Sequence, residues 1–299
     1  MPKPLFRGVC ASSITPFHPD GSLWLERLKP HIDWLIAERV DAISPLGSSG
    51  EFPAMECADR ERVLAAALDA IAGRVPVVAG THDYSTARTV QLSKFAESAG
   101  ADALLIVPPY YMAPTPAQVM DHYRRVAEAV SIPIVLYHNI PLTSVDLTTE
   151  HLLKLYEERA IAGVKMSHPE PDRQCQLLQA TQGAFSVYAG IDTAAFEGLC
   201  HGSHGWISGI PSTVPGSARR LYELIAIEEN LPEARKLWCK LAKGEGAHWF
   251  STMKAALNMI GPPVGDPQPP ILPLPQAYRK TLADMLTNLG YEVNTKVEG

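Results

Sequence analysis

The sequence has no apolar run of about 18 residues, the length needed to span a bilayer. Its first residues also lack an apolar segment of signal-peptide length. No basic cluster is present, and the net charge of −6 argues against nucleic acid and anionic membranes as partners. The five cysteines are scattered, without a CxxC pair or a regular disulfide spacing. We therefore expect a cytoplasmic protein that binds neither nucleic acid nor membranes.

The sequence also lacks a glycine-rich dinucleotide fingerprint, which argues against a doubly wound nucleotide-binding sheet. Instead, short apolar runs, typical of parallel strands that are covered on both faces, alternate with helical segments. Eight such runs occur, at residues 8–15, 41–46, 75–81, 103–107, 132–137, 161–167, 185–189 and 205–208. The alternation predicts an α/β protein with a (β/α)8 TIM-barrel fold.

The pattern changes after the eighth apolar run. Three helical segments follow one another, and a proline-rich span at residues 261–270 separates them from a last helical segment. The four segments cover residues 215–229, 231–243, 246–259 and 275–289. We therefore predict a barrel with the catalytic site over residues 1–225 and a C-terminal helical extension over residues 226–299 that packs on the barrel.

The sixth apolar run contains a single lysine, Lys165, within Ile161-Ala162-Gly163-Val164-Lys165-Met166-Ser167. A desolvated amine loses its proton more easily and becomes a nucleophile towards carbonyl groups. The structural alternative is a lysine whose long side chain bends out into water at a strand end. The active sites of such barrels lie at the C-terminal ends of the strands. The residues at the other strand ends therefore help to decide whether Lys165 is a nucleophile or a solvent-directed lysine.

The second apolar run ends in Gly47-Ser48-Ser49-Gly50-Glu51. The two glycines permit a tight turn, and the amides and hydroxyls between them can hold a carboxylate or a phosphate. An ordinary turn with serine caps has the same composition, so this segment alone leaves both interpretations open.

Three more strand ends carry tyrosine, histidine or glycine. Tyr111 follows the fourth run, and Tyr137 and His138 end the fifth. Either tyrosine can move protons or simply pack, and His138 can act with Tyr137 or be a hydrogen-bonded core group. Gly190 follows the seventh run and leaves room beside Lys165. Together, these strand ends supply an amine, a proton carrier and an anion site, which suit Schiff-base chemistry on a 2-oxo acid.

The loop at residues 47–51, the Tyr137 and Lys165 pair and Gly190 resemble the dihydrodipicolinate synthase/N-acetylneuraminate lyase family of class I aldolases. The resemblance covers essentially the whole chain. It implies that Lys165 forms a covalent imine with pyruvate or another 2-oxo acid, without a metal or another cofactor. It also implies that Tyr137 is the general acid and base, and that Gly190 and the backbone of Ile207 border the imine.

The resemblance assigns further roles around the imine. Gly47 belongs to the substrate-binding loop, in which Ser49 would hold the substrate carboxylate and Ser48 would take part in the proton relay. Tyr111 would match the tyrosine that family members insert into the site of a neighbouring subunit. Family members are commonly homotetramers, so the resemblance implies a homotetramer here.

One part of the family pattern is missing. Dihydrodipicolinate synthases usually carry an arginine shortly after the tyrosine, whereas residues 141–144 here read Pro-Leu-Thr-Ser, and the usual Tyr-Asn-x-Pro is stretched to Tyr137-His138-Asn139-Ile140-Pro141. The departure favours an aldolase or dehydratase for a pyruvate-derived or sugar-derived 2-oxo acid. His138 and Asn139 would then read substrate hydroxyls. The alternative is 4-hydroxy-tetrahydrodipicolinate synthase, which joins pyruvate to aspartate semialdehyde.

Three rival interpretations are open to the sequence. His201-Gly202-Ser203-His204 could belong to a metal-dependent barrel, although it has neither a carboxylate partner nor the spacing of a zinc motif. The glycine-rich segment at residues 202–209 lies where barrels bind phosphate. The non-enzyme alternative is a catalytically silent sensor of 2-oxo acids, and the presence of both Tyr137 and Lys165 argues against it.

Overall fold

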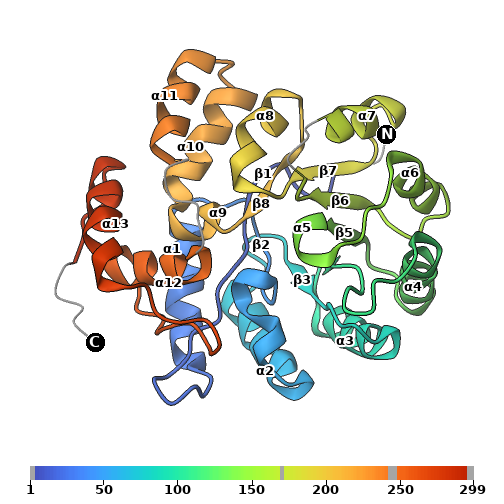
Figure 1. Cartoon of the computed structure of the whole chain (residues 1–299), viewed down its shortest axis with the longest axis horizontal. Coiled ribbons are helices and arrows are strands. Elements are labelled where there is room, and N and C mark those ends of the chain that lie inside the picture. The colour runs from blue at the N-terminus through green and yellow to red at the C-terminus, as the bar shows by residue number, and fades with distance from the viewer. Residues whose placement is uncertain (1–3, 169–171, 242–247, 295–299) are drawn as a thin grey trace.

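The computed structural model describes residues 4–168, 172–241 and 248–294, which form a ring of parallel strands surrounded by helices (Figure 1). The eight strands form one sheet in the order β2-β1-β8-β7-β6-β5-β4-β3. Their bounds are β1 (Gly8–Ala11), β2 (Ala42–Ile43), β3 (Val78–Gly80), β4 (Ala103–Ile106), β5 (Ile134–His138), β6 (Gly163–Met166), β7 (Ser186–Ala189) and β8 (Gly205–Ser208). A parallel bridge between Ile43 and Val77 joins the two ends of the sheet. The predicted (β/α)8 barrel is confirmed.

A layer of helices covers the outside of the barrel (Figure 1). In chain order these are α1 (Leu28–Ala37), α2 (Cys57–Ile71), α3 (Thr86–Ala99), α4 (Pro116–Ala129), α6 (Thr149–Glu157), α7 (Asp172–Ala180), α8 (Ala195–Cys200) and α10 (Pro215–Ala226). Their ends follow local chemistry. Helix α4 begins with a capping box between Thr115 and Gln118, and α3 ends at Gly100 in the left-handed conformation that glycine adopts readily.

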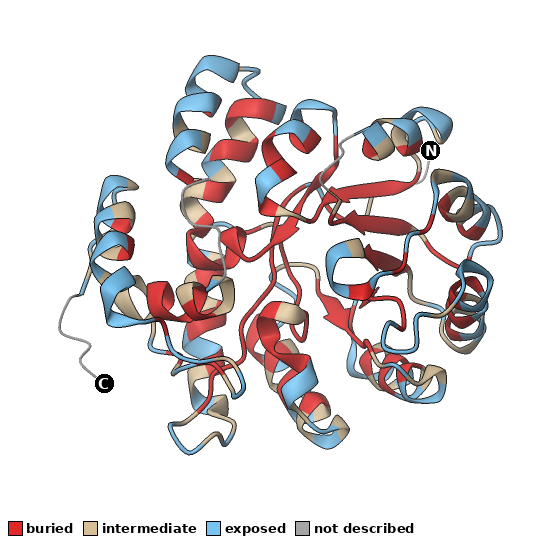
Figure 2. Cartoon of the chain, viewed as in Figure 1, coloured by how far each residue is buried: buried red, intermediate tan, exposed pale blue. Residues whose placement is uncertain are grey.

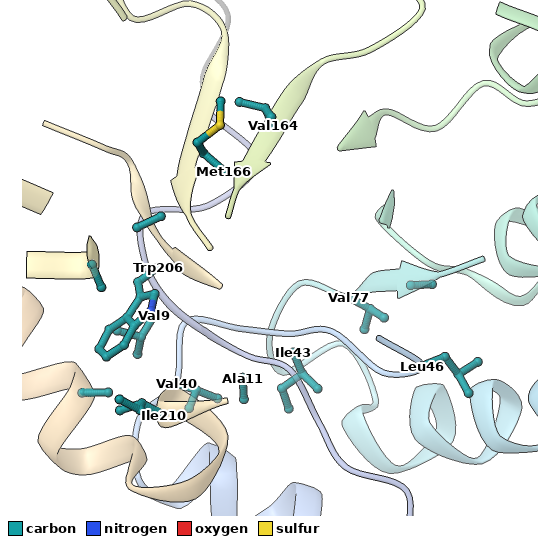
Figure 3. Packing of buried hydrophobic residues seen from close by; sticks show 14 of the residues in the cluster. Val9, Ala11, Val40, Ile43, Leu46, Val77, Val164, Met166, Trp206 and Ile210 are labelled. Carbon is teal, nitrogen blue, oxygen red and sulfur yellow. The ribbon is translucent and has the colours of Figure 1, made fainter. Parts of the chain in front are cut away.

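The strand side chains divide into an inner and an outer layer. Tyr137 belongs to a cluster inside the barrel, whereas Leu136, Val164 and Met166 pack outward against the helices, as Figure 3 shows in part. Successive residues of a strand point to opposite faces, so Lys165, between Val164 and Met166, points into the barrel. The strands are therefore buried on both faces, while the outer surfaces of the helices are exposed (Figure 2).

The C-terminal helices lie together on one side of the barrel (Figure 1). After α10 the chain forms α11 (Leu231–Leu241), α12 (Trp249–Ile260) and α13 (Gln276–Asn288). An apolar cluster joins α12 to the loop after β1 and contains Ile14, Met253, Leu257 and Val264. The helical extension is thus present. The boundary at residue 225 falls within α10 and stays a prediction, and the predicted helix ends at Lys243 and Gly246 lie outside the described residues.

Several short helices at the strand ends were missed by the sequence pattern. They include α5 (Ile140–Thr143), α9 (Ile210–Thr213) and two 3-10 helices at Ser48–Gly50 and Phe52–Ala54. Segments of three or four residues are too short to show helical periodicity, which explains the omission. Among the residues that the structure describes, none of the helices combines the length and the apolar character needed to cross a membrane.

Candidate active site

Lys165 and Tyr137 lie side by side on neighbouring strands. The parallel register of β5 and β6 pairs the two residues directly. The Nζ atom of Lys165 lies 3.9 Å from the centre of the Tyr137 ring. Lys165 is 5% exposed and Tyr137 is 6% exposed, so both functional groups are withdrawn from bulk water. A buried amine in contact with a phenol is an arrangement that can form an imine and move its protons.

The hydroxyl of Tyr137 is surrounded by hydrogen-bonding side chains. Asn139 donates to it from Nδ2 at 2.9 Å, and the hydroxyls of Ser48 and Ser167 also bond to it. Burial raises the pKa of Tyr137, but the neighbouring Lys165 and these hydrogen bonds outweigh burial and hold the pKa below its ordinary value. A phenol whose proton is easier to remove is better suited to proton exchange near neutral pH.

The serine loop, residues 47–51, follows β2 and turns sharply at the mouth of the barrel. Two amides at the end of the turn donate within the loop at 3.0 Å each, so they are already engaged. Thr15 Oγ1 donates to the Gly50 carbonyl at 2.7 Å and holds the turn against the loop after β1. Ser48 and Ser49 line the cavity beside the lysine. The serine hydroxyls are among the groups that this loop can offer to a substrate carboxylate.

Gly190, directly after β7, gives Lys165 its room. A Cβ atom at this position would lie 2.6 Å from Cγ of Lys165 and 2.7 Å from Oγ of Ser167. The Gly190 carbonyl also accepts a hydrogen bond from Ser167 Oγ at 2.6 Å. A larger residue would displace both side chains, so the predicted need for glycine beside the lysine has a direct steric basis.

A cavity of about 330 Å³ covers these groups at the C-terminal ends of the strands. Three of its polar residues were missed by the sequence interpretation: Ser167, Asp192 and Ser208. Ser167 directly follows β6, Asp192 lies shortly after β7, and Ser208 ends β8. The rule that barrel active sites collect residues at the strand ends could have identified all three.

A second cavity, of about 370 Å³, adjoins the first. The two share Ser48, Asn139, Leu142 and Phe250, and several proline and aromatic residues line the remainder of the second. Leu142 lies on α5, in the segment where the sequence lacks an arginine. A substrate that extends away from Lys165 past this residue meets an uncharged aliphatic side chain.

His138 is placed away from the cavity, in the outer layer of the barrel. Its Nε2 atom accepts the N–H of Leu147 at 3.0 Å, and its Nδ1 atom lies 3.3 Å from Sδ of Met166. Burial lowers the pKa of His138 to about 4, so the ring is neutral at pH 7. The prediction that His138 reads substrate hydroxyls does not hold, because the ring serves as a hydrogen-bonded structural group. Asn139, by contrast, lines both cavities.

Three other predicted site residues also lie apart from the cavity wall. Ile207 belongs to the cluster inside the barrel, and the cavity wall at the end of β8 is formed by Ser208 and Gly209 instead. Gly47 begins the serine loop in an extended conformation, and its carbonyl accepts the N–H of Gly50. Tyr111 lies in the loop between β4 and α4 and is 83% exposed, so it does not contribute to the cavity of its own chain.

The histidines of the HxxH segment occupy different environments. His201 is exposed, whereas His204 is buried and its Nδ1 atom accepts the N–H of Val187 at 3.1 Å. Within residues 4–168, 172–241 and 248–294, no group of three or more histidine, cysteine, aspartate or glutamate side chains is placed to hold a metal ion. The segment therefore gives the metal-dependent interpretation no support.

A buried lysine in contact with a tyrosine at the strand ends of a barrel suits an enzyme of the class I aldolase type, which works through a Schiff base. Comparison with known proteins identifies the family to which the chain belongs. The model of the Dihydrodipicolinate synthetase family matches residues 5–289, and the chain belongs to this family. Membership supports an enzyme of the Schiff-base lyase kind.

Individual relatives agree over almost the full chain. The 4-hydroxy-tetrahydrodipicolinate synthase of Ralstonia nicotianae is 32% identical over 289 residues, which cover 95% of this chain and 97% of the relative. The solved dihydrodipicolinate synthase of Aquifex aeolicus is 28% identical, with a TM-score of 0.89 and coverage of 97% and 100%. YagE, a prophage protein of E. coli K12 solved in complex with pyruvate, is 28% identical, with a TM-score of 0.90 and coverage of 96% and 99%.

Proposed function

We propose that the chain is a class I lyase that acts on 2-oxo acids through an imine at Lys165. The contact between the buried Lys165 amine and the Tyr137 ring carries this proposal. The amine attacks the keto carbon, and loss of water forms the imine while Tyr137 transfers the protons. Ser49 holds the substrate carboxylate and Ser48 joins Tyr137 in the proton relay. The covalent link to lysine supplies the electron sink, so the chemistry calls for no cofactor.

The substrate is a sugar-derived 2-oxo acid. The cavity also presents the polar side chains of Asp192 and Ser208, and such groups suit the hydroxyls of a deoxy sugar acid. The iminium draws electrons from the adjacent bonds, which favours either cleavage of a carbon–carbon bond or loss of water. Leu142, which lines both cavities, offers no positive charge to a second substrate carboxylate.

The second candidate is 4-hydroxy-tetrahydrodipicolinate synthase, because the curated relatives at about 32% identity carry this name. This reaction joins pyruvate to aspartate semialdehyde, and Leu142 offers the carboxylate of the semialdehyde no charged partner. The silent-sensor alternative is disfavoured by the Lys165 and Tyr137 contact, because simple binding of a 2-oxo acid needs neither a nucleophile nor a proton carrier.

Tyr111 acts in the site of a second copy of the chain, and the assembly is a tetramer. Its exposed ring lies beside two other exposed side chains, Tyr110 and Met112, and such apolar surface favours association. One structural neighbour is described as a monomeric dihydrodipicolinate synthase variant, so family membership alone does not set the assembly.

A panel of 2-oxo acids separates the two reactions. We expect deoxy sugar acids to release pyruvate or lose water at a higher kcat/KM than the condensation of pyruvate with aspartate semialdehyde. Pyruvate release, water loss and condensation are followed separately with the same enzyme preparation. A higher kcat/KM for the condensation would contradict the proposed substrate class while leaving the imine chemistry in place.

Gly190→Ala tests the steric account of Lys165. We expect turnover to fall by at least about tenfold, because the added Cβ displaces the reactive side chain. The overpacking should also reduce the free energy of unfolding by about 1–3 kcal/mol, measured by urea denaturation. Gly261→Ala is the control, since its Cβ would lie 3.4 Å from the nearest atom, the Leu257 carbonyl oxygen. Wild-type turnover in Gly190→Ala would show that Lys165 does not need this space.

A further inference from the structure

A buried ion pair ties the serine loop to the C-terminal helices. Glu51, the last residue of the loop, meets Lys254 on α12 at 2.6 Å between Oε1 and Nζ. Their side chains are 5% and 2% exposed. Glu51 lies directly beyond the turn that carries the serine hydroxyls. A contact that fixes the Glu51 side chain therefore also restricts the conformation of that turn.

Further contacts join this pair to the proline-rich segment and to the loop after β1. The N–H of Gln268 donates to Oε2 of Glu51 at 2.6 Å, and Nζ of Lys254 donates to the Asp266 carbonyl at 3.0 Å. Nζ also lies 4.5 Å from the centre of the Phe17 ring. Segments from distant parts of the chain therefore converge on the ion pair: Gln268 contacts Glu51, whereas Asp266 and Phe17 contact Lys254.

A buried pair of this kind is a weak source of stability, because the removal of two charges from water offsets much of their attraction. Apolar residues of similar size often stabilise a core equally well. Burial lowers the pKa of Lys254, while the attraction to Glu51 works against that shift. The pair is better explained by the geometry that it fixes than by the stability that it adds.

The backbone around Glu51 shows which geometry is fixed. Glu51 adopts the left-handed conformation, with a φ of 57°, which is uncommon for a residue other than glycine. On the other side of the turn, Thr15 Oγ1 bonds to the Gly50 carbonyl at 2.7 Å. A Cβ atom at Gly50 would lie 3.1 Å from the Ser13 carbonyl oxygen, so the turn also packs closely against this loop. The serine turn is thus held from two sides.

We propose that Lys254 is a positioning residue that acts through Glu51 to orient the Ser48 and Ser49 hydroxyls and so sets the affinity for the substrate carboxylate. Helix α12 then contributes to the cavity in two ways. Lys254 acts on it through Glu51, and Trp249 and Phe250 at the beginning of the helix line it directly. The inference rests on the proposed function, which assigns the substrate carboxylate to the serine loop.

Lys254→Met tests this role through the binding of pyruvate. We expect the pyruvate concentration for half-maximal borohydride trapping at Lys165 to rise by at least about tenfold, because the serine turn loses its anchor. The limiting trapping rate should fall less than this, since Lys165 keeps its contact with Tyr137. Lys280→Met on α13 is the matched control. Its pair with Asp284 is exposed and contributes little, so half-saturation should match the wild type.

Glu51→Gln breaks the same pair with little change in volume and should produce the same rise. If Lys254→Met does not fold, the Glu51→Gln variant by itself tests the positioning role of the pair. Lys254→Arg keeps the charge and should recover part of the affinity. Because both changes break one contact, Glu51→Gln with Lys254→Met should have about the effect of either alone.

The positioning role would be overturned if the folded variants had the wild-type pyruvate concentration for half-maximal trapping. It would also be overturned if the two changes multiplied their effects on that concentration in the double variant. The absence of any adduct in the wild-type protein would instead contradict the proposed function. The two failures are therefore distinguishable.

Discussion

Lys165→Ala is expected to lose turnover by on the order of 10⁴-fold or more, because the variant lacks the amine that forms the imine. The residue lies on a cavity wall, so its removal leaves open space rather than an unpaired group in the core. Thermal unfolding should therefore stay close to that of the wild type. Turnover is measured with the best substrate of the 2-oxo acid panel, and folding is followed by circular dichroism.

Lys154→Ala is the matched control for this change, because Lys154 is an exposed lysine on α6. We expect it to keep wild-type turnover. Substantial turnover in folded Lys165→Ala would show that another group carries the substrate, and the assignment of the nucleophile would then be wrong.

Tyr137→Phe is expected to lower turnover by about 10²-fold or more, the usual scale for a positioned general acid and base. The ring stays in contact with Lys165, so the change removes only the hydroxyl whose pKa is held below its ordinary value. Single-turnover measurements should show slower formation of the imine and slower release of product. Both steps need a proton transfer at the same position.

Tyr278→Phe is the control for loss of a phenol, because Tyr278 is half exposed on α13. Its turnover should be that of the wild type. Full activity in Tyr137→Phe would assign the proton transfer to a different group, such as the Ser48 hydroxyl, and would leave the role of Lys165 untouched.

The barrel could be predicted because strands that are covered on both faces appear as short apolar runs. The predicted runs are longer than the strands, as residues 8–15 are compared with β1 at Gly8–Ala11. The reason is physical: the chain stays buried in the loop beyond this strand, through Ile14 and Thr15, although its backbone hydrogen bonds to the neighbouring strand ends stop at Ser12 and Ser13. A run of apolar residues indicates which residues are buried, and the buried segment extends beyond the end of the strand.

The core of the site could be predicted from positions at the strand ends, which bring Lys165, Tyr137 and Gly190 together. His138 follows Tyr137 on the same strand, so strand alternation turns its ring outward when Tyr137 points inward, and the predicted contact with substrate is wrong. The Glu51 and Lys254 pair was beyond prediction. Its contact depends on how α12 docks against the barrel, and neither residue carries a local pattern that indicates its partner.

The central claim is that Lys165 forms a covalent imine with a 2-oxo acid. The most direct test is to incubate the wild-type protein with pyruvate and borohydride and then to locate any adduct by peptide mass spectrometry. We expect a reduced pyruvyl group on the peptide that contains Lys165 and none in a sample that lacks pyruvate. An unmodified Lys165 peptide after this treatment, or an adduct on a different lysine, would contradict the claim.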